Sequence, residues 1–135
     1  MIVDAANVVG SRPDGWWRDP AAATVRLRDE LVAVARAGLP SLPAPIEVVL
    51  VVEGAARHVA PVPGVRVVPA PGAGDETVVD LVRARPPGRV CVVITADRAL
   101  RARVERAGAL VRGPRSLWPI RTVQEGRSSA EPDRF

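Results

Sequence analysis

Short apolar runs, most of them rich in valine and isoleucine, alternate along this chain with stretches that have the periodicity of a helix. The apolar runs cover residues 2–4, 46–52, 65–68, 90–94 and 109–111. The helical stretches, which end near a glycine or a proline, cover residues 21–37, about 75–84 and 97–107. Strands that alternate with helices predict a doubly wound, Rossmann-like parallel sheet with helices on both faces. We therefore expect a three-layer α/β/α fold with four to five parallel strands and the most apolar run, residues 90–94, at its centre.

The chain has 135 residues and nearly half of them are apolar, which fits one compact domain. We expect this domain to cover residues 1–125, with a loop at residues 5–19 and a poorly ordered polar tail at residues 126–135. The chain opens on a predicted strand, and no apolar run reaches the roughly 18 residues of a membrane span. We therefore expect a cytoplasmic protein without a signal peptide. Its single cysteine, Cys91, allows no internal disulfide.

The charge of the chain comes from arginine alone. All 19 basic side chains are arginines, the formal net charge is +4 and the sequence pI is about 11.1. The choice of arginine over lysine is typical of chains encoded by GC-rich genomes. A basic domain that also carries an acidic cluster still indicates an anionic substrate, with arginines on its phosphates and a cation among the carboxylates.

Four acidic side chains fall where predicted strands end or predicted helices begin. Asp4 and Asp97 close apolar runs, and Glu76 and Asp80 are four residues apart, so they share one face of a helix. Ligands of a parallel sheet bind at the carboxyl ends of its strands, and carboxylates gathered there repel one another unless a cation joins them. Oxygen ligands are those that Mg²⁺ and Mn²⁺ prefer. We expect these four carboxylates to converge on one or two such ions, with Asn7 orienting a bound water or a phosphate oxygen.

Each acidic position also has a structural alternative. Asp4 and Asp97 are suitable caps for the segments that follow them, and Asp75 is a good N-cap for the helix near residue 75. Acidic side chains in the first helical turn also complement the helix dipole. Asp80 lies within an apolar pattern, which favours a role in the site. Glu53, which follows the run 46–52, is either a fifth acidic member of the site or a solvated loop residue.

Two adjacent tryptophans stand in the first predicted loop. Trp16 and Trp17 either pack on the following helix or offer a stacking platform for an unpaired base. We expect Trp16 to be the more exposed of the two and to contact RNA. Three arginines are expected on the phosphates of the substrate: Arg12, Arg18 and Arg98.

Several common chemistries lack their motifs. The chain contains neither Gly-x-Gly-x-x-Gly nor a Walker Gly-Lys-Ser/Thr, so nucleotide binding by a glycine-rich loop is unsupported. His58 is the only histidine, which argues against a zinc site and against a Ser-His-Asp triad. An Asp-x-Asp phosphatase motif is also missing, because Ala6 stands where the second aspartate would be.

The order of these motifs resembles that of a known group. The opening Ile-Val-Asp-Ala-Ala-Asn-Val-Val-Gly, followed by Trp17 and a leucine-bearing helix, resembles NYN domains of the PIN-like nuclease fold, and most of all the YacP-like subgroup. The pair Glu76-x-x-x-Asp80 is similar to the acidic helix pair of that subgroup, with Glu and Asp exchanged. Residues 92–98 and Gly108-Ala109 are similar to its Thr-Ser-Asp strand end and to the Gly-Ala before its last strand. Glu53 departs from the pattern, which would have Asp there.

The resemblance covers about residues 1–118 and implies a metal-dependent ribonuclease. Combined with the acidic cluster, it predicts an endoribonuclease that uses Mg²⁺ or Mn²⁺ and has RNA as its partner, with a homodimer left open. Two alternatives from other classes remain. One is an RNA- or ribosome-binding module with this fold and little catalysis, and the other is a hydrolase of small nucleotides.

Overall fold

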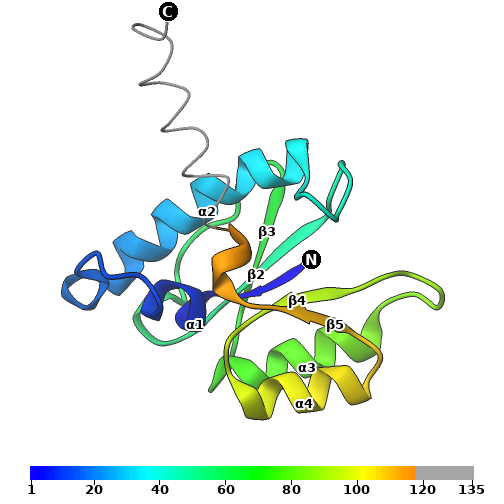
Figure 1. Cartoon of the computed structure of the whole chain (residues 1–135). Helices are drawn as coiled ribbons and strands as arrows, with labels where there is room; N and C mark the ends of the chain where they lie inside the picture. Colours follow the sequence, from blue (N-terminus) through cyan, green and yellow to red (C-terminus); the bar gives the residue numbers. More distant parts are fainter. Residues whose placement is uncertain (118–135) are drawn as a thin grey trace, which may run out of the picture.

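The computed structural model describes residues 1–117, which form a five-stranded parallel sheet with the order β3-β2-β1-β4-β5 (Figure 1). The strands are β1 (Ile2–Asp4), β2 (Val48–Val52), β3 (Val65–Pro69), β4 (Val92–Ile94) and β5 (Leu110–Arg112). Every neighbouring pair is parallel. The predicted α/β class and parallel sheet are confirmed.

The centre of the sheet differs from the prediction. β1 is the middle strand and β4 lies beside it. After β1 the chain builds β2 and β3 on one side, then crosses back to place β4 and β5 on the other. Residues 90–94 were expected at the centre because they form the most apolar run, but apolarity does not fix strand order, since β1, β2 and β4 are all buried on both faces.

Helices cover both faces of the sheet and complete the three layers (Figure 1). The described helices are α1 (Ala5–Gly10), α2 (Pro20–Ala37), α3 (Gly74–Ala84) and α4 (Arg98–Arg106), with short 3-10 turns η1 (Trp16–Arg18), η2 (Gly54–Ala56) and η3 (Pro114–Leu117). Helices α1 and α2 pack on one face, and α3 and α4 pack on the other.

Helix α1 corrects the loop expected at residues 5–19. Its six residues are too few to show a helical period in the sequence, and so short a helix is not stable by itself. Val8 and Val9 are buried in the core beneath α2, and this packing holds the turn in helical form. The chain therefore leaves β1 directly into a helix, which fixes Asn7 close to the end of the strand.

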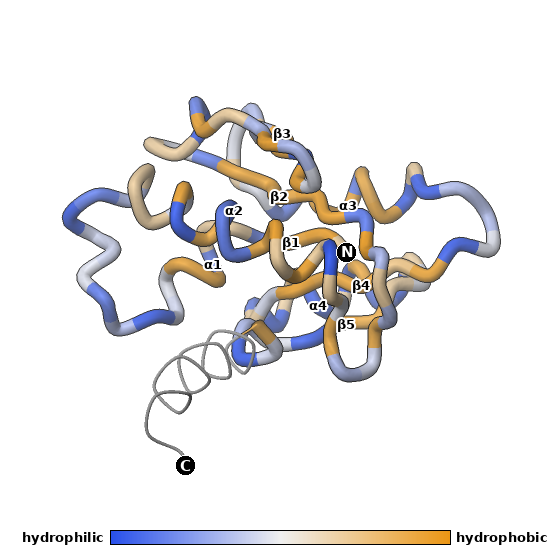
Figure 2. Tube along the Cα trace, turned by 90° about the horizontal axis from the view of Figure 1, so that it is seen from above, coloured by the Kyte–Doolittle hydropathy of each residue, from blue (hydrophilic) through white to orange (hydrophobic). Residues whose placement is uncertain are grey.

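Two apolar cores, one on each face, follow from the alternation of side chains along the strands. Val3, Leu50 and Ile94 face α1 and α2. Their neighbours Ile2, Val51 and Val93 face α3 and α4. In Figure 2 the strands form the hydrophobic centre of the molecule, and the outer loops are hydrophilic.

The same alternation places the polar residues that follow the strands. The side chains of Val3, Val52 and Ile94 face α1 and α2. The residues that follow them therefore face the α3 and α4 side of the sheet; these are Asp4, Glu53 and Thr95. All three stand at the carboxyl edge of adjacent strands.

No helix within residues 1–117 is both long enough and apolar enough to cross a membrane. The predicted domain end at residue 125 and the predicted tail at residues 126–135 lie outside the described residues.

Candidate functional site

Asp4 and Thr95 end neighbouring strands and contact each other directly. The register pairs Val3 with Ile94, which brings the next two residues side by side. The Thr95 Oγ1 hydroxyl donates to Asp4 Oδ2 at 3.0 Å. Both side chains are buried, with 7% of Asp4 and 2% of Thr95 exposed. A buried carboxylate needs hydrogen-bond or charge partners, so Thr95 holds Asp4 in place. Between β1 and β4 the winding of the sheet changes direction, which is where α/β sheets bind ligands.

A network of hydrogen bonds connects this pair to the start of α4. The Asp97 N–H donates to Thr95 Oγ1 at 3.1 Å. The Ala96 N–H donates to Asn7 Oδ1 at 2.7 Å, so α1 holds the turn that carries Asp97. Asp97 Oδ1 in turn accepts the Leu100 N–H at 3.0 Å and caps α4. The predicted residues Asp4, Asn7 and Asp97 are thus brought together, with Thr95 as their common partner.

The electrostatics of Asp4 show which other carboxylates lie near it. Burial raises the pKa of the Asp4 carboxyl above its ordinary value, and the hydrogen bond from Thr95 lowers this pKa in part. The negative charges of Glu53 and Asp97 raise the same pKa further. Glu53 and Asp97 are therefore close enough to repel the Asp4 carboxylate.

Glu53 joins the acidic edge to α3. Its Oε2 accepts the Gly74 N–H at 3.0 Å and satisfies one of the free donors at the start of the helix. The prediction that Asp75 caps this helix was wrong, because Ala73 stands at the N-cap position and no side chain of α3 itself makes the bond. A Cβ atom at position 74 would lie 3.4 Å from Glu53 Oε1, in van der Waals contact with the carboxylate. The sequence feature that pointed to Glu53 was its position directly after the strand run 46–52.

Glu76 and Asp80 face α4 and not the strand ends. Glu76 Oε1 lies 2.9 Å from Arg103 Nη1, and Asp75 Oδ2 lies 3.6 Å from the same nitrogen. The hydrogen bond from Arg103 lowers the pKa of Glu76. The bond with Glu76 is also the main cause that raises the pKa of Arg103, and the charge of Asp80 contributes to that rise. Neither Glu76 nor Asp80 hydrogen-bonds to Asp4 or Asp97 in the structure.

The predicted convergence of four carboxylates is not found. Among residues 1–117, no three His, Cys, Asp or Glu side chains are positioned to hold a metal ion together. The acidic residues instead divide into a group around Asp4, with Glu53 and Asp97, and a group on α3 that pairs with Arg103.

The tryptophans exchange their expected roles. Trp17 is 61% exposed, and the Arg18 guanidinium lies 6.0 Å from the centre of its ring. Trp16 is half-buried against the core under α2 and meets Trp17 edge to face, with 6.3 Å between the ring centres. The prediction that Trp16 is the more exposed was wrong. The Trp16 ring also packs against Gly10, where a Cβ would be in ordinary van der Waals contact with it at 3.8 Å.

The three arginines predicted to bind phosphates have different surroundings. The Arg12 side chain is only 5% exposed, and its Nη2 lies 2.9 Å from Glu30 Oε1 on α2. This is ion-pair distance, but the geometry falls outside a hydrogen bond, and Arg12 Nε has no hydrogen-bond partner among residues 1–117. Arg18 and Arg98 are exposed, and Arg98 follows Asp97 at the start of α4. Arg98 thus adjoins the acidic edge through Asp97, whereas Arg18 lies beside Trp17.

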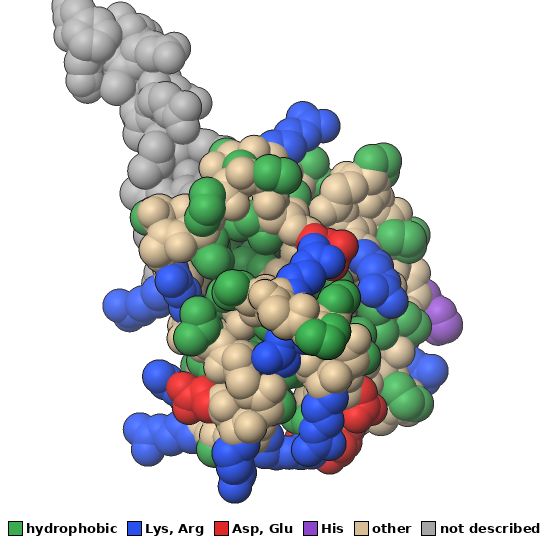
Figure 3. All heavy atoms as spheres, turned by 90° about the vertical axis from the view of Figure 1, so that its right-hand side faces the viewer, with side chains coloured by type: hydrophobic (Ala, Val, Ile, Leu, Met, Phe, Trp, Pro, Cys, Tyr) green, Lys and Arg blue, Asp and Glu red, His purple; other side chains and the backbone are tan. Residues whose placement is uncertain are grey.

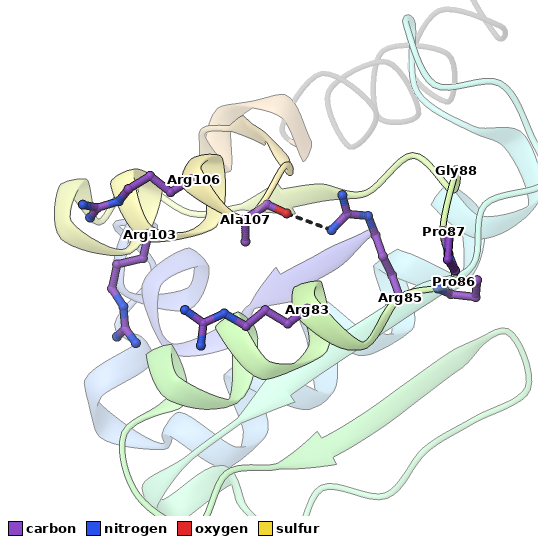
Figure 4. Close-up of a pocket in the computed structure, with 8 residues that line it drawn as sticks. All are labelled: Arg83, Arg85, Pro86, Pro87, Gly88, Arg103, Arg106 and Ala107. Atoms are coloured by element: carbon purple, nitrogen blue, oxygen red, sulfur yellow. Dashed lines mark hydrogen bonds between the residues drawn. The ribbon is translucent and has the colours of Figure 1, made fainter.

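Two cavities of the described part lie away from the acidic edge. One of about 670 Å³ opens between the carboxyl-terminal ends of α3 and α4 (Figure 4). The other, of about 530 Å³, lies at the opposite edge of the sheet around Met1 and Cys91. Asp4, Asn7 and Asp97 line neither of them.

Comparison by sequence finds no matching family model and no matching curated protein. Comparison by structure finds the crystal structure of Rae1 (YacP) from Bacillus subtilis, with a TM-score of 0.72 and 18% identity over 98% of this chain and 82% of that chain. A mutant of the same protein gives a TM-score of 0.68 and 18% identity over 97% of this chain and 78% of that chain. The chain therefore has the fold of YacP, and the resemblance to YacP-like NYN domains is confirmed for the fold.

Proposed function

We propose that this protein is a divalent-metal-dependent ribonuclease whose active site is the edge formed by Asp4, Asn7, Thr95 and Asp97. One observation carries the proposal. A buried carboxylate, Asp4, is held by Thr95 at the point where the sheet changes direction, within the electrostatic reach of Asp97. A folded protein has little reason to place such a group there for stability, because burying a charge is costly. The fold shared with YacP supports the same class of activity.

The residues around Asp4 fit a Mg²⁺ or Mn²⁺ ion. Mg²⁺ is held by one or two carboxylates, with water and substrate phosphates as the remaining ligands, so it does not require a cage of three protein carboxylates. Asp4 and Asp97 would hold the ion, which would offset the repulsion that the acidic neighbours exert on Asp4. When bound, it would supply an activated water and stabilise the charge that develops on the scissile phosphate. Glu76 and Asp80 are not needed for this role.

The other residues of the edge position the ligands and the substrate. Thr95 orients Asp4, and Asn7 fixes the turn before Asp97. Arg98 extends the site towards a phosphate of the substrate, and Arg18 does so beside Trp17. Trp17 offers its exposed face to an unpaired base, which favours single-stranded RNA as the partner.

Cleavage of single-stranded RNA in Mn²⁺ tests the proposal. Asp97→Asn should lower the cleavage rate by orders of magnitude and leave the fold intact. Glu105→Gln is the matched control, because it makes the same chemical change on α4 at an exposed ion pair with Arg101. Wild-type cleavage in excess EDTA, or full cleavage by Asp97→Asn, would contradict the proposal.

The same experiment separates the alternatives. An RNA-binding module would bind RNA in EDTA and cleave nothing in Mn²⁺. A hydrolase of small nucleotides would turn over free nucleotides and leave RNA intact. Either outcome would replace the ribonuclease proposal.

A further inference from the structure

The cavity between α3 and α4 is lined by four arginines and by no carboxylate. Arg83 and Arg85 come from the end of α3, and Arg103 and Arg106 come from α4 (Figure 4). The turn 86–88 and Ala107 complete the lining. We call this cavity, of about 670 Å³, the arginine groove. In the space-filling view, arginines stand along the lower margin of the molecule, which is the side of α3 and α4 (Figure 3).

Two of the four arginines are used by the fold. Arg85 Nη1 donates to the carbonyls of Val82 at 2.8 Å and Ala107 at 3.2 Å, so it closes the ends of both helices. A Cβ at Gly108 would lie 2.7 Å from Arg85 Nη2, which shows how closely this side chain is packed. Arg103 is held by Glu76 at 2.9 Å. These contacts within the fold account for Arg85 and Arg103 without any ligand.

Arg83 and Arg106 also stand in the last turns of α3 and α4, where the helix dipole favours a cation, but neither guanidinium group is fixed by such contacts. Both are exposed, and within residues 1–117 neither makes an ion pair with a carboxylate. Arg106 Nε donates to the Ala102 carbonyl at 3.3 Å, which leaves its two terminal nitrogens for other partners. Figure 4 shows the Arg83 side chain extending from α3 into the space towards Arg103. The groove therefore combines two fixed guanidinium groups with two available ones.

The chemistry of the lining selects phosphate as the ligand. Guanidinium groups bind phosphate oxygens through paired N–H donors. The lining has no aromatic ring on which a base could stack. The nearby carboxylates of Asp75 and Glu76 are engaged by Arg103 and do not line the groove. A backbone of repeated phosphates fits such a surface better than a single nucleotide, whose base would have no site.

We propose that the arginine groove is a second RNA-binding site, which holds backbone phosphates of the strand that reaches the acidic edge. This inference rests on the proposed ribonuclease function. Helix α3 connects the two places: Gly74 at its start bonds to Glu53 at the acidic edge, and Arg83 lies about 14 Å farther along the helix. Both sites are on the same face of the sheet, so a few extended nucleotides span the distance between them. The groove adds affinity for long RNA and does not take part in cleavage.

The test is the double substitution Arg83→Gln with Arg106→Gln. Glutamine keeps a similar side-chain length and helix propensity, and Arg85 and Arg103 stay in place. Binding of poly(U) is measured in EDTA across a series of salt concentrations. Affinity for RNA falls with salt, and each phosphate contact on a single strand contributes about 0.7 to the steepness of log affinity against log salt. Loss of both contacts should therefore make this dependence shallower by about 1.4. Affinity at low salt should fall by about tenfold.

The matched control is Arg26→Gln with Arg36→Gln, which removes the same charge from exposed positions of α2 on the opposite face. This control should keep the wild-type salt slope. Cleavage of an oligonucleotide too short to reach the groove should be the same in the wild type and in both variants. Melting temperatures of the variants show that each is folded.

The outcomes separate the two proposals. An unchanged salt slope in the groove variant, with wild-type protein that binds and cleaves RNA, overturns the arginine groove and leaves the ribonuclease proposal standing. Equal losses in the groove and control variants mean a general charge effect and also overturn it. Wild-type protein that binds no RNA overturns both. Loss of affinity for anionic lipid vesicles, with RNA binding intact, assigns the groove to a different partner and rejects this inference.

Discussion

Thr95 is the residue on which the geometry of the acidic edge depends most directly, because one hydroxyl donates to Asp4 and accepts from the Asp97 N–H. Thr95→Val keeps the shape of the side chain and removes both bonds. We expect a loss of about 1–3 kcal/mol in the free energy of unfolding, since a buried carboxyl loses its partner. Urea unfolding measures this loss, and RNA cleavage should fall with it.

Thr24→Val is the matched control for that substitution. Thr24 is equally buried, but its hydroxyl bonds to the Pro20 carbonyl within α2. This variant should retain wild-type cleavage per folded molecule. If Thr95→Val also retains it, the hydroxyl does not position Asp4 for catalysis.

The raised pKa of Asp4 predicts how the stability of the metal-free protein depends on pH. Because the folded pKa lies above the unfolded one, the folded state binds the proton more tightly, and stability falls as pH rises from the unfolded pKa through the folded pKa. Asp4→Asn removes this dependence, so it should stabilise the metal-free protein at neutral pH and give no advantage below the ordinary carboxyl pKa of about 4. Urea unfolding at both pH values checks the prediction. A variant that is less stable than the wild type at neutral pH would mean that the Asp4 charge is well compensated without metal.

Trp17 and Trp16 should separate binding from stability. Trp17→Ala removes an exposed ring, so we expect an almost unchanged melting temperature and about tenfold weaker binding of single-stranded RNA, the effect of one lost stacked base. Trp16→Ala opens a gap against the core and should mainly lower the melting temperature. If Trp17→Ala binds RNA as the wild type does, the exposed ring has no part in the substrate site.

At the scale of the element, the N-terminus of α3 is capped by Glu53, which follows β2. Glu53→Ala removes the acceptor for the Gly74 N–H and should cost about 0.5–2 kcal/mol in the free energy of unfolding. Glu53→Gln keeps an acceptor oxygen and should retain most of that stability. Removal of the Glu53 charge should also lower the pKa of Asp4, which NMR titration of its carboxyl can follow. Equal stability of both variants would show that the cap contributes little.

Most elements could be predicted from sequence because their patterns are local. The continuous valine-rich run that forms β2 and the apolar helical stripe of α2 are properties of the chain itself. Helix α1 could not be predicted, since six residues show no period and its form depends on packing under α2. The cap of α3 was assigned to Asp75 because sequence rules consider only nearby residues, whereas the real acceptor, Glu53, is 21 positions away.

At the scale of the whole molecule, topology decided which acidic residues meet. Asp4 and Asp97 were predicted together because both end strands, and the placement of β1 beside β4 brings them to the same edge. Glu76 and Asp80 share a helical face as predicted, but that face is turned towards Arg103 of α4. The rotation of α3 about its own axis is set by the apolar side chains that pack on the sheet. Glu76 and Asp80 are not among these side chains.

Metal binding should be visible in the stability of the whole domain. Under the proposed function, Mn²⁺ at 100 times its dissociation constant adds about 2.7 kcal/mol to the free energy of unfolding. Melting curves across a Mn²⁺ series should show this rise for the wild type and for Glu105→Gln. The double variant of Asp4→Asn with Asp97→Asn should show none. An equal rise in all three proteins would indicate non-specific binding.

The position of β1 at the middle of the sheet has a consequence for when the protein can act. β1 and its partners β2 and β3 come from the first part of the chain, and β4 and β5 come from the second. β1 and β4 can therefore pair only after both parts of the chain have been synthesised. The first part contains Asp4 and the second contains Asp97, the two proposed ion ligands. A nascent or truncated chain that lacks β4 has no complete site. Under the proposed function, a nascent chain therefore cleaves no RNA before β4 has joined the sheet.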